Sequence, residues 1–325
     1  MGFSLNQVIG NYECLGIIEK PRAGVTYKVR NLATGEIESL RALLGATSRD
    51  PEFTERLLRE IRIQTRLSHP NIVEFHDAFE VDGQLMMTTE FIEGSTLAEI
   101  CRVGPIPPRD AIRTIADVLD ALEDAHTLGI LHRGITAEHI TITADGAVKL
   151  SGFDLAKPAS DNNLTQVGTV PGDPRYISPE QVLGQPAPDA RSDLYSVGVL
   201  LYQTLTGKMP FEALNDIEVL TAQVRSEPPR PSSVNPAISA ELDQVVLTAL
   251  QKNPDKRFPD AKAFRAALVA AETGTQPPAP PVRNAPSPAP PHSLVQPKPR
   301  RSLTVPLVCG SVVVVIAVIS WVAMH

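Results

Sequence analysis

HRGITAEHITI (residues 132–142), followed by SGFDL (residues 151–155), is the most informative stretch of this chain. On both sides of it, apolar residues recur three to four positions apart, a spacing typical of amphipathic helices. The predicted helices cover residues 111–130, 192–207, 216–225 and 238–251. Before Gly94 the pattern predicts strands with a single helix. The strands are expected at residues 12–19, 25–32 and 36–43, and the helix at residues 50–67. The sequence therefore predicts a strand-rich first part and a helical second part.

Composition predicts a folded protein for which nucleic acid is not the main partner. The chain has 325 residues, 42% of them hydrophobic, which supplies enough apolar surface for a large core. Its net charge is −7 and no basic stripe stands out, so no nucleic-acid partner is expected. Cys14, Cys101 and Cys309 are far apart and never in a C-x-x-C spacing. Neither a disulfide framework nor a zinc site is predicted, and the folded part is expected in a reducing compartment.

The C-terminal residues change character twice. Residues 273–302 contain 10 of the 30 prolines, which predicts a semi-rigid, extended linker. Residues 303–323 carry no charge and match the roughly 20 residues that cross a bilayer, so they predict a transmembrane helix. The basic residues Lys298, Arg300 and Arg301 precede this span, which places the folded body in the cytoplasm. The expectation is a single-pass membrane protein with a C-terminal anchor.

Several motifs around residue 134 resemble those of the eukaryotic-like Ser/Thr protein kinases, especially the membrane-anchored bacterial type. The resemblance covers about residues 11–271 and rests on HRG at 132–134, SPE at 178–180, SDLYSVG at 192–198 and NPDKRF at 253–258. It implies an α+β, bilobal protein-kinase fold. The expected parts are a small β-rich lobe (residues 1–91), a large helical lobe (residues 92–272), the linker and the transmembrane helix.

The resemblance also implies which residues hold the helical lobe together. In the family, the residue at Glu180 pairs with the residue at Arg257, and the residue at Asp193 ties the loop backbone near His132 and Arg133. Such buried pairs are costly to break, because an unpaired charge would remain. This set of matches predicts an intact structural framework.

At the positions of the chemistry, the chain departs from the family that it resembles. Gly134 replaces the catalytic aspartate, Thr136 a lysine, His139 an asparagine, and Gly152 the magnesium-binding aspartate. No catalytic residue is therefore expected, and rescue by Glu138 or Asp154 is the less favoured alternative. His132 and His139 would suit a metal, but the family places His132 in the core beside Phe153. No metal site is predicted.

The nucleotide pocket implied by the resemblance is also altered. Glu19 and Pro21 stand at the first two glycine positions of the loop that covers the phosphates. Three polar residues replace the apolar ones that usually pack around adenine, so weak adenine binding or none is expected. The hinge resembles that of the family. The residues assigned to the pocket are Gly24, Thr26, Ser39, Arg41, Thr89, Glu90, Ile92 and Thr141.

Two further assignments leave alternatives open. Arg41 stands where the family has a phosphate-contacting lysine, and Glu60 matches the helix glutamate that pairs with that lysine. A structural pair, in which the arginine fork grips the carboxylate through two nitrogens, is favoured over phosphate binding. Thr165 and Thr169 lie where activation-loop phosphates usually occur, and Arg133 would receive such a phosphate. An ordinary exposed loop is the equal alternative.

The sequence thus predicts a membrane-anchored, catalytically inactive kinase-like protein, a pseudokinase, that acts as a scaffold or allosteric regulator in Ser/Thr phosphosignalling. Its expected partners are an active kinase or another signalling protein, together with the membrane. No cofactor is expected. The competing prediction is a weak or unconventional Ser/Thr kinase that uses ATP with Mg²⁺. A third alternative is a membrane adaptor that captures partners through the Pro-rich linker.

Overall fold

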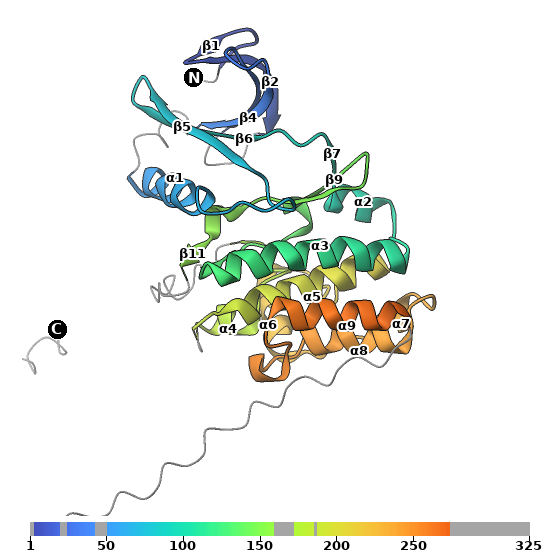
Figure 1. Cartoon of the computed structure of the whole chain (residues 1–325). Helices are drawn as coiled ribbons and strands as arrows, with labels where there is room; N and C mark the ends of the chain where they lie inside the picture. The colour runs from blue at the N-terminus through green and yellow to red at the C-terminus, as the bar shows by residue number, and fades with distance from the viewer. Residues whose placement is uncertain (1–2, 20–24, 43–50, 159–171, 185–186, 274–325) are drawn as a thin grey trace, which may run out of the picture. The chain divides into compact units, whose positions relative to one another are not determined.

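The computed structural model describes residues 3–19, 25–42, 51–158, 172–184 and 187–273, all within one compact unit. A sheet of strands forms one lobe and a group of helices forms the other (Figure 1). The predicted α+β, bilobal architecture is confirmed. Gly24, Thr165 and Thr169 lie outside the described residues, as do residues 274–302 of the predicted linker and the predicted membrane span at 303–323.

The small lobe is built on an antiparallel sheet with the strand order β1-β2-β3-β4-β6-β5. Its strands are β1 (Val8–Ile9), β2 (Tyr12–Glu19), β3 (Val25–Asn31), β4 (Ile37–Ala42), β5 (Phe75–Val81) and β6 (Gln84–Glu90). Side chains alternate along β4: Leu40 and Ala42 are buried in the core, whereas Ser39 and Arg41 belong to the opposite face. The three strands expected from the sequence are confirmed to within one residue at each end.

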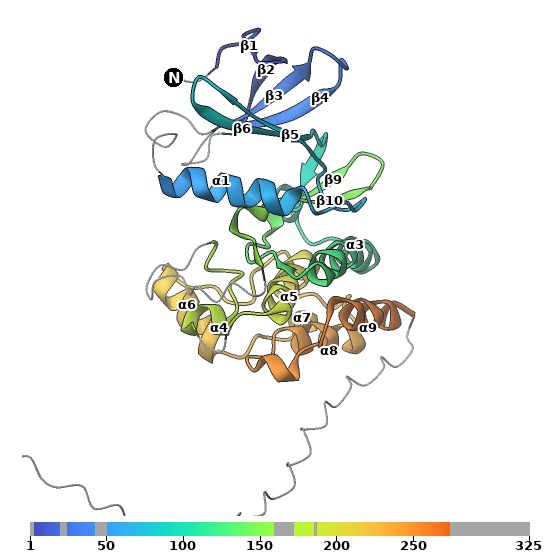
Figure 2. The ribbon, with the colours of Figure 1, turned by 60° about the vertical axis from the view of Figure 1, so that its left-hand side comes forward.

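Helix α1 (Pro51–Gln64) lies between this sheet and the helical lobe (Figure 2). Its buried Leu57 forms a small core with Met87 of β6. The predicted helix was three residues too long at its C-terminal end, because residues 65–67 form a turn that closes with hydrogen bonds back to the last helical carbonyls. Glu60 therefore sits on a helix that packs directly against the sheet.

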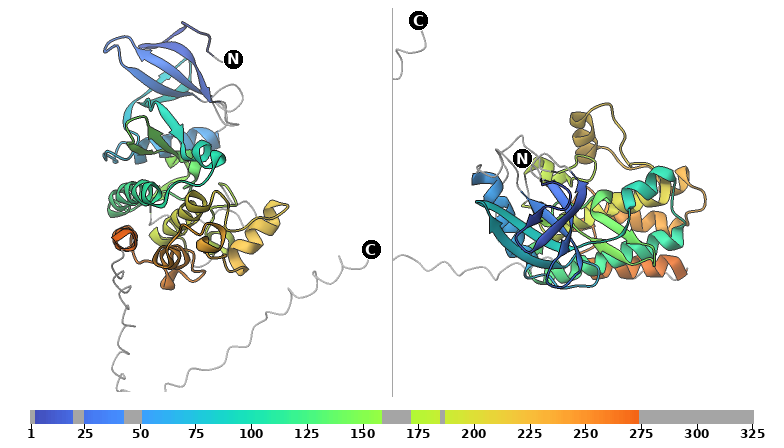
Figure 3. Two further views of the ribbon diagram at one scale, coloured as in Figure 1. Left: turned by 90° about the vertical axis from the view of Figure 1, so that its right-hand side faces the viewer. Right: turned by 90° about the horizontal axis from the view of Figure 1, so that it is seen from above.

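The helical lobe lies below the strands in the left view of Figure 3 and is organised around α3 and α5, which contact each other and each contribute more buried core residues than any other element. Its α-helices are α2 (Leu97–Val103), α3 (Pro108–Thr127), α4 (Pro179–Leu183), α5 (Ala190–Thr206), α6 (Asp216–Arg225), α7 (Pro231–Val234), α8 (Ala240–Ala249) and α9 (Ala261–Thr273). All four helices predicted from periodicity are present. The first of them was extended too far, since Ile130 belongs to a strand.

Short strands within the helical lobe support the HRGITAEHITI segment. A small sheet has the order β10-β9-β7, and β11 pairs with β8. These elements are β7 (Gly94–Thr96), β8 (Ile130–Leu131), β9 (Ile140–Thr143), β10 (Val148–Leu150) and β11 (Lys157–Pro158), with 3₁₀ turns η2 (Ala137–His139), η3 (Phe153–Leu155) and η4 (Pro254–Lys256). Residues 132–139 consequently connect β8 to β9. Each of these two strands is paired with other strands, which fixes both ends of the loop.

The described part of the chain contains no helix that combines the length and apolar character needed to cross a bilayer.

Candidate nucleotide and catalytic site

Asp193, near the start of α5, holds the loop that begins at His132. Its buried carboxylate accepts hydrogen bonds from the backbone N–H groups of His132 (2.9 Å) and Arg133 (2.8 Å), and from Nε2 of His126 (2.8 Å). Burial alone would raise the pKa of Asp193, but these donors, led by His126, bring it below its usual value. Arg133 adopts a positive φ of 62°, so the loop backbone turns sharply where Asp193 grips it.

The His132 side chain is a fully buried structural group. Its Nε2 donates to the carbonyl oxygen of Ser151 (2.9 Å), and its Nδ1 accepts from the backbone N–H of Gly134 (3.2 Å). Its ring lies 4.5 Å from the ring of Phe153, centroid to centroid. Burial lowers the pKa of His132 to about 4, so the ring is neutral at pH 7. Nε2 carries the proton and the lone pair of Nδ1 accepts a hydrogen bond, so the ring offers no lone pair to a metal.

A second buried contact ties the segment after residue 172 to the end of the helical lobe. Arg257 donates from Nη1 and Nη2 to the two oxygens of Glu180, at 2.7 and 2.8 Å. Ser192 also donates to Glu180, at 2.6 Å. Burial favours the neutral acid, yet Arg257 and Ser192 together lower the pKa of Glu180. The structure thus places every expected framework residue in the contact that the family resemblance implied.

At the loop positions that the resemblance assigns to catalysis, neighbouring side chains take the space of the missing catalytic ones. Gly134 is buried, and a Cβ atom built on it would lie 3.2 Å from Cδ1 of Leu155. The same Leu155 methyl would lie 3.5 Å from a Cβ atom on Gly172. An apolar side chain therefore lies over the position where the resemblance places the catalytic base. Thr136, the lysine position, has its hydroxyl 3.3 Å from Nδ1 of His139.

His139 and Gly152 lie against each other. Gly152 has a left-handed conformation (φ 85°, ψ 35°), and a Cβ atom built on it would lie 2.5 Å from Cγ of His139. His139 Nδ1 donates to the carbonyl oxygen of Gly134, at 2.7 Å. The imidazole therefore occupies the space that any side chain at position 152 would enter.

Arg41 of β4 contacts Glu60 of α1 across the small lobe. Both oxygens of Glu60 accept from the same arginine nitrogen, Nη1, at 3.0 and 2.9 Å, so the contact is not the two-nitrogen fork that the sequence suggested. Burial raises the pKa of Glu60 to about 7 in spite of Arg41. Burial lowers the pKa of Arg41, but the charges of Glu60, Asp154 and Glu19 outweigh it and raise that pKa. Asp154, two residues beyond Gly152, thus belongs electrostatically to this pair.

Of the residues assigned to the pocket, Thr26, Ser39 and Thr89 lie on the face of the six-stranded sheet that carries Arg41, whereas Thr141 lies on β9 of the small sheet in the helical lobe. Thr26 pairs with Arg41 between β3 and β4, and Ser39 pairs with Thr89 between β4 and β6. Thr26, Ser39, Thr89, Ile92 and Thr141 are all partly buried. In the hinge, Glu90 forms an ion pair with Lys149 of β10, with 2.8 Å between Oε2 of Glu90 and Nζ of Lys149.

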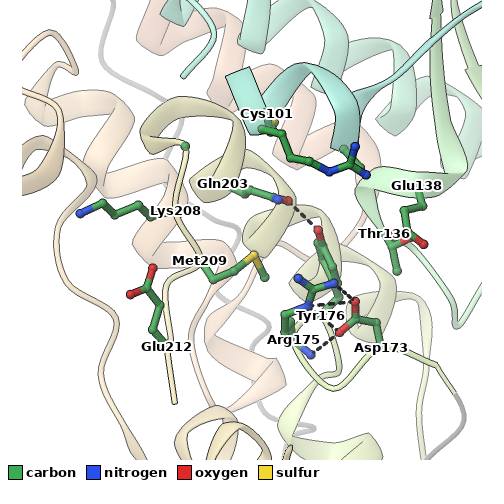
Figure 4. Close-up of a pocket in the computed structure, with 13 residues that line it drawn as sticks. Cys101, Thr136, Glu138, Asp173, Arg175, Tyr176, Gln203, Lys208, Met209 and Glu212 are labelled. Atoms are coloured by element: carbon green, nitrogen blue, oxygen red, sulfur yellow. Dashed lines mark hydrogen bonds and ion pairs between the residues drawn. The ribbon is translucent and has the colours of Figure 1, made fainter. Parts of the chain in front are cut away.

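A pocket of about 310 Å³ opens in the helical lobe beside Thr136 and Glu138. Tyr176 and Gln203 point toward one another in its wall, where the Tyr176 hydroxyl donates to Oε1 of Gln203 at 2.6 Å (Figure 4). Next to them Arg175 pairs with Asp173, Nε to Oδ1 at 2.9 Å. The remaining lining residues are Ala98, Cys101, Arg102, Gly207, Lys208, Met209 and Glu212. The wall is therefore strongly polar and carries both charges.

A family model described as the protein kinase domain matches residues 12–268. This chain belongs to the protein kinase domain family. Serine/threonine-protein kinase PknB of Mycobacterium leprae is 40% identical over 250 residues, which cover 75% of this chain and 40% of that protein. PknB of Mycobacterium tuberculosis (strain ATCC 25618 / H37Rv) is 40% identical over 260 residues, covering 78% and 41%. This kinase-family chain thus spans about two fifths of the length of those relatives.

Solved structures agree with this family. The crystal structure of the Mycobacterium tuberculosis PknI kinase domain aligns with a TM-score of 0.65 at 25% identity. The alignment covers 83% of this chain and all of that one. The predicted membership of the protein kinase family is confirmed.

The divalent cation used by this kinase family does not fit the residues present. Gly152 has no side chain to offer, and His139 Nδ1 already donates to a backbone carbonyl. Mg²⁺ prefers oxygen ligands, whereas the position of the second ligand holds an imidazole. In the part of the chain that the structure describes, no group of three or more His, Cys, Asp or Glu side chains is placed to hold a metal ion.

Sequence reasoning overlooked several residues of this kinase-like site. His126 is a third donor to Asp193, and Leu155 lies over Gly134. The Tyr176–Gln203 contact in the pocket was not foreseen either. His126 follows an apolar stripe on a predicted helix, so a polar residue at the end of a buried face was the available signal. Leu155 gave no signal, because a single leucine two residues after Phe153 is ordinary.

Proposed function

We propose that this chain is a membrane-anchored pseudokinase. It keeps the protein-kinase fold as a docking body, does not transfer phosphate, and acts as a scaffold or allosteric regulator of an active Ser/Thr kinase or of another signalling protein. The uncharged residues 303–323 anchor it, and the basic residues before them keep the folded body in the cytoplasm. It requires neither nucleotide nor metal for this role.

One observation carries the proposal: the His139 imidazole fills the space beside Gly152, where a kinase would hold its magnesium-binding carboxylate. Loss of a general base costs about 10² to 10⁴ in rate, and loss of the metal removes several kcal/mol of charge stabilisation. Leu155 adds to this loss, because it covers the position of the base at Gly134. Against a kinase turnover of roughly 1 to 100 per second, negligible phosphotransfer is expected.

Retention of a well-packed body supports a binding role. Asp193 and Glu180 keep full sets of donors although neither takes part in chemistry here. The pocket beside Glu138, which the family resemblance places on the peptide-binding side, offers a docking position for a partner segment. Its mixture of acidic and basic side chains suits a polar, charged peptide better than an apolar one.

The test is a radiolabelled phosphotransfer assay on the purified full-length chain in detergent, with a generic Ser/Thr peptide mixture, in Mg²⁺ and in Mn²⁺. A PknB-type kinase serves as the active control. We expect no label above a heat-denatured sample of the same chain. Label incorporated by the folded chain at a rate within about a thousandfold of the control would sink the pseudokinase proposal.

A weak or unconventional Ser/Thr kinase is the second candidate. The relatives at 40% identity are named as kinases, and Asp154 remains electrostatically coupled to the Arg41–Glu60 pair. On this alternative the chain uses ATP with Mg²⁺ and substitutes Asp154 for the lost ligand. It predicts slow label incorporation that Asp154→Asn abolishes.

A partner-capture experiment distinguishes the proposed scaffold, which docks partners on its kinase-like body, from an adaptor that captures them through the linker. Deletion of residues 277–299 removes most of the Pro-rich linker and leaves the kinase-like body intact. If the body docks partners, crosslinking in membranes should recover the same partners with this deletion. Loss of all partners in the deleted chain would instead favour the adaptor.

A further inference from the structure

Position 152 is closed to any side chain by the ring of His139. A Cβ atom on Gly152 would lie 2.5 Å from Cγ, 2.6 Å from Cδ2 and 2.6 Å from Nδ1 of that ring. Contacts under 3 Å between such atoms are far inside van der Waals range, so something would have to move. The two residues are therefore sterically coupled: the glycine is required by the histidine.

The ring of His139 is not free to swing aside. Its Nδ1 donates to the carbonyl oxygen of Gly134 at 2.7 Å, which fixes χ angles and tautomer together. Its backbone carbonyl accepts from the N–H of Ser151 at 2.8 Å and from the Ser151 hydroxyl at 3.2 Å. Its backbone N–H donates to Thr136. Because Ser151 directly precedes Gly152, these bonds hold the ring and the glycine against each other.

We infer that the His139 imidazole closes the cation position of the kinase cleft, so that this chain cannot hold a divalent cation between positions 139 and 152. The inference rests on the proposed non-catalytic function and deepens it, since it names what the cleft excludes. A nucleotide that enters the cleft would have to bring its phosphates without a cation held at this position. Glu60, Asp154 and Glu19, the acidic residues around Arg41, would then repel the phosphates with no bound cation between them to screen the repulsion.

A consequence is that the aspartate of an active kinase cannot be restored alone. Gly152→Asp would place its Cβ within 2.6 Å of three atoms of the His139 ring, whatever the rotamer of the new side chain. Only a change at both positions, His139→Asn with Gly152→Asp, returns the oxygen ligands that Mg²⁺ or Mn²⁺ prefers and the space to hold them.

The steric part is tested by thermal unfolding of the full chain in detergent. Gly152→Ala adds one methyl group at φ 85°, and Gly35→Ala is the matched control, because Gly35 has φ 80° with nothing within 4 Å of its Cβ position. We expect Gly152→Ala to lower Tm by about 5 °C more than Gly35→Ala does. In a His139→Ala background this excess should vanish. Equal effects of the two alanines in the parent chain would overturn the inference.

The cation part is tested by electron paramagnetic resonance of Mn²⁺ with a non-hydrolysable ATP analogue. The parent chain should give no bound Mn²⁺ that depends on nucleotide. In the presence of the analogue, the double variant His139→Asn/Gly152→Asp should bind Mn²⁺ at least about tenfold tighter than the parent chain does. Nucleotide-dependent Mn²⁺ binding by the parent, or none by the folded double variant, would contradict the inference. Phosphotransfer by the parent would instead refute the proposed function, and the alanine comparison would still decide whether His139 excludes a side chain at 152.

Discussion

Two sets of residues in the helical lobe, the buried framework and the positions assigned to catalysis, differ in what their side chains do. In the framework, Asp193 and the Glu180–Arg257 pair are buried, charged and fully supplied with partners. At the chemical positions, Gly134 and Gly152 carry no side chain at all. A buried charge that loses its partner is costly, whereas an absent cleft side chain costs the fold little. The comparison teaches that fold and phosphotransfer depend on separate residues in this molecule.

Under the proposed function, this separation explains how a kinase-family body can be kept without kinase chemistry. The same loop carries both kinds of residue, since His132 faces the core and Gly134 faces Leu155. Function must therefore be argued from the individual positions of the site, not from the fold. Four predictions, each tested by substitution, can break or sharpen the comparison between the framework and the positions assigned to catalysis.

The largest effect is expected for Arg257→Ala. The Arg257 side chain is 0% exposed and that of Glu180 is 3% exposed, so the variant leaves a buried carboxylate without its main partner. We expect a loss of about 3 to 5 kcal/mol in unfolding free energy, or roughly 10 °C in Tm. Urea unfolding followed by circular dichroism measures it.

The matched control for Arg257→Ala is Arg265→Ala. Arg265 contacts Asp120 at 2.8 Å, but their side chains are 45% and 32% exposed. Its removal should cost less than about 1 kcal/mol. If the two arginine variants lost equal stability, the framework would not depend on burial as argued. The double variant Arg257→Met/Glu180→Leu should recover part of the loss, because no charge remains buried.

A pH-dependent loss of stability is expected from His132. Its pKa is lowered to about 4 in the folded chain, against an unfolded value of about 6.5. Between these values the unfolded state binds more protons, so unfolding free energy should fall as pH drops from about 6.5 toward 4, by up to about 3 kcal/mol. Chemical denaturation across this range measures the slope. His132→Gln should flatten it, and an unchanged slope in that variant would assign the effect elsewhere.

An intermediate effect is expected from Arg41→Met. Glu60, buried on α1, would lose the charge that supports its ionised form, at a cost of about 2 kcal/mol. Burial already raises the pKa of Glu60 to about 7, and stability from such a carboxyl group falls as pH rises through that value. The loss should therefore be larger at pH 8 than at pH 6. Arg41→Lys keeps the charge and should be close to neutral, so a large loss there would contradict a simple ion pair.

Much of the fold followed from the sequence because its signals are local. Periodicity located β2, β3, β4, α3, α5, α6 and α8, since their apolar residues recur with a strand or helix period, although α5 is buried on nearly every side. Strands β1 and β5 to β11 were not predicted, and those from β7 onward have only two to four residues, too few for a period to be recognised, so they are set by pairing with other segments. Ile130 shows this: it continues an apolar helical pattern but pairs with Pro158.

For the site, the sequence identified the altered positions but not what fills them. Gly134 and Gly152 were recognisable from the family motif, whereas the space beside each is taken by Leu155 and His139. Such filling depends on how three segments pack, and no spacing rule reports it. The sequence also did not predict the geometry of the Arg41–Glu60 contact. It suggested that two arginine nitrogens would bind the carboxylate, whereas Nη1 alone donates to both oxygens of Glu60. The activation-loop threonines lie outside the described residues, and their phosphorylation stays a prediction.

The smallest effect is expected at Gly134, and it gives the sharpest contrast with Arg257. Gly134 has no positive φ, so an added Cβ meets no backbone strain and must only displace the Cδ1 methyl of Leu155 at 3.2 Å. That displacement is partly offset by the lower entropy of the unfolded alanine chain, so Gly134→Ala should change stability by less than about 1 kcal/mol. Gly134→Asp should fold too, yet give no phosphotransfer, because the cation position beside His139 remains closed. Label transfer by Gly134→Asp alone would show that the missing base was the sole barrier, and that the framework and the chemical positions are less separate than the structure indicates.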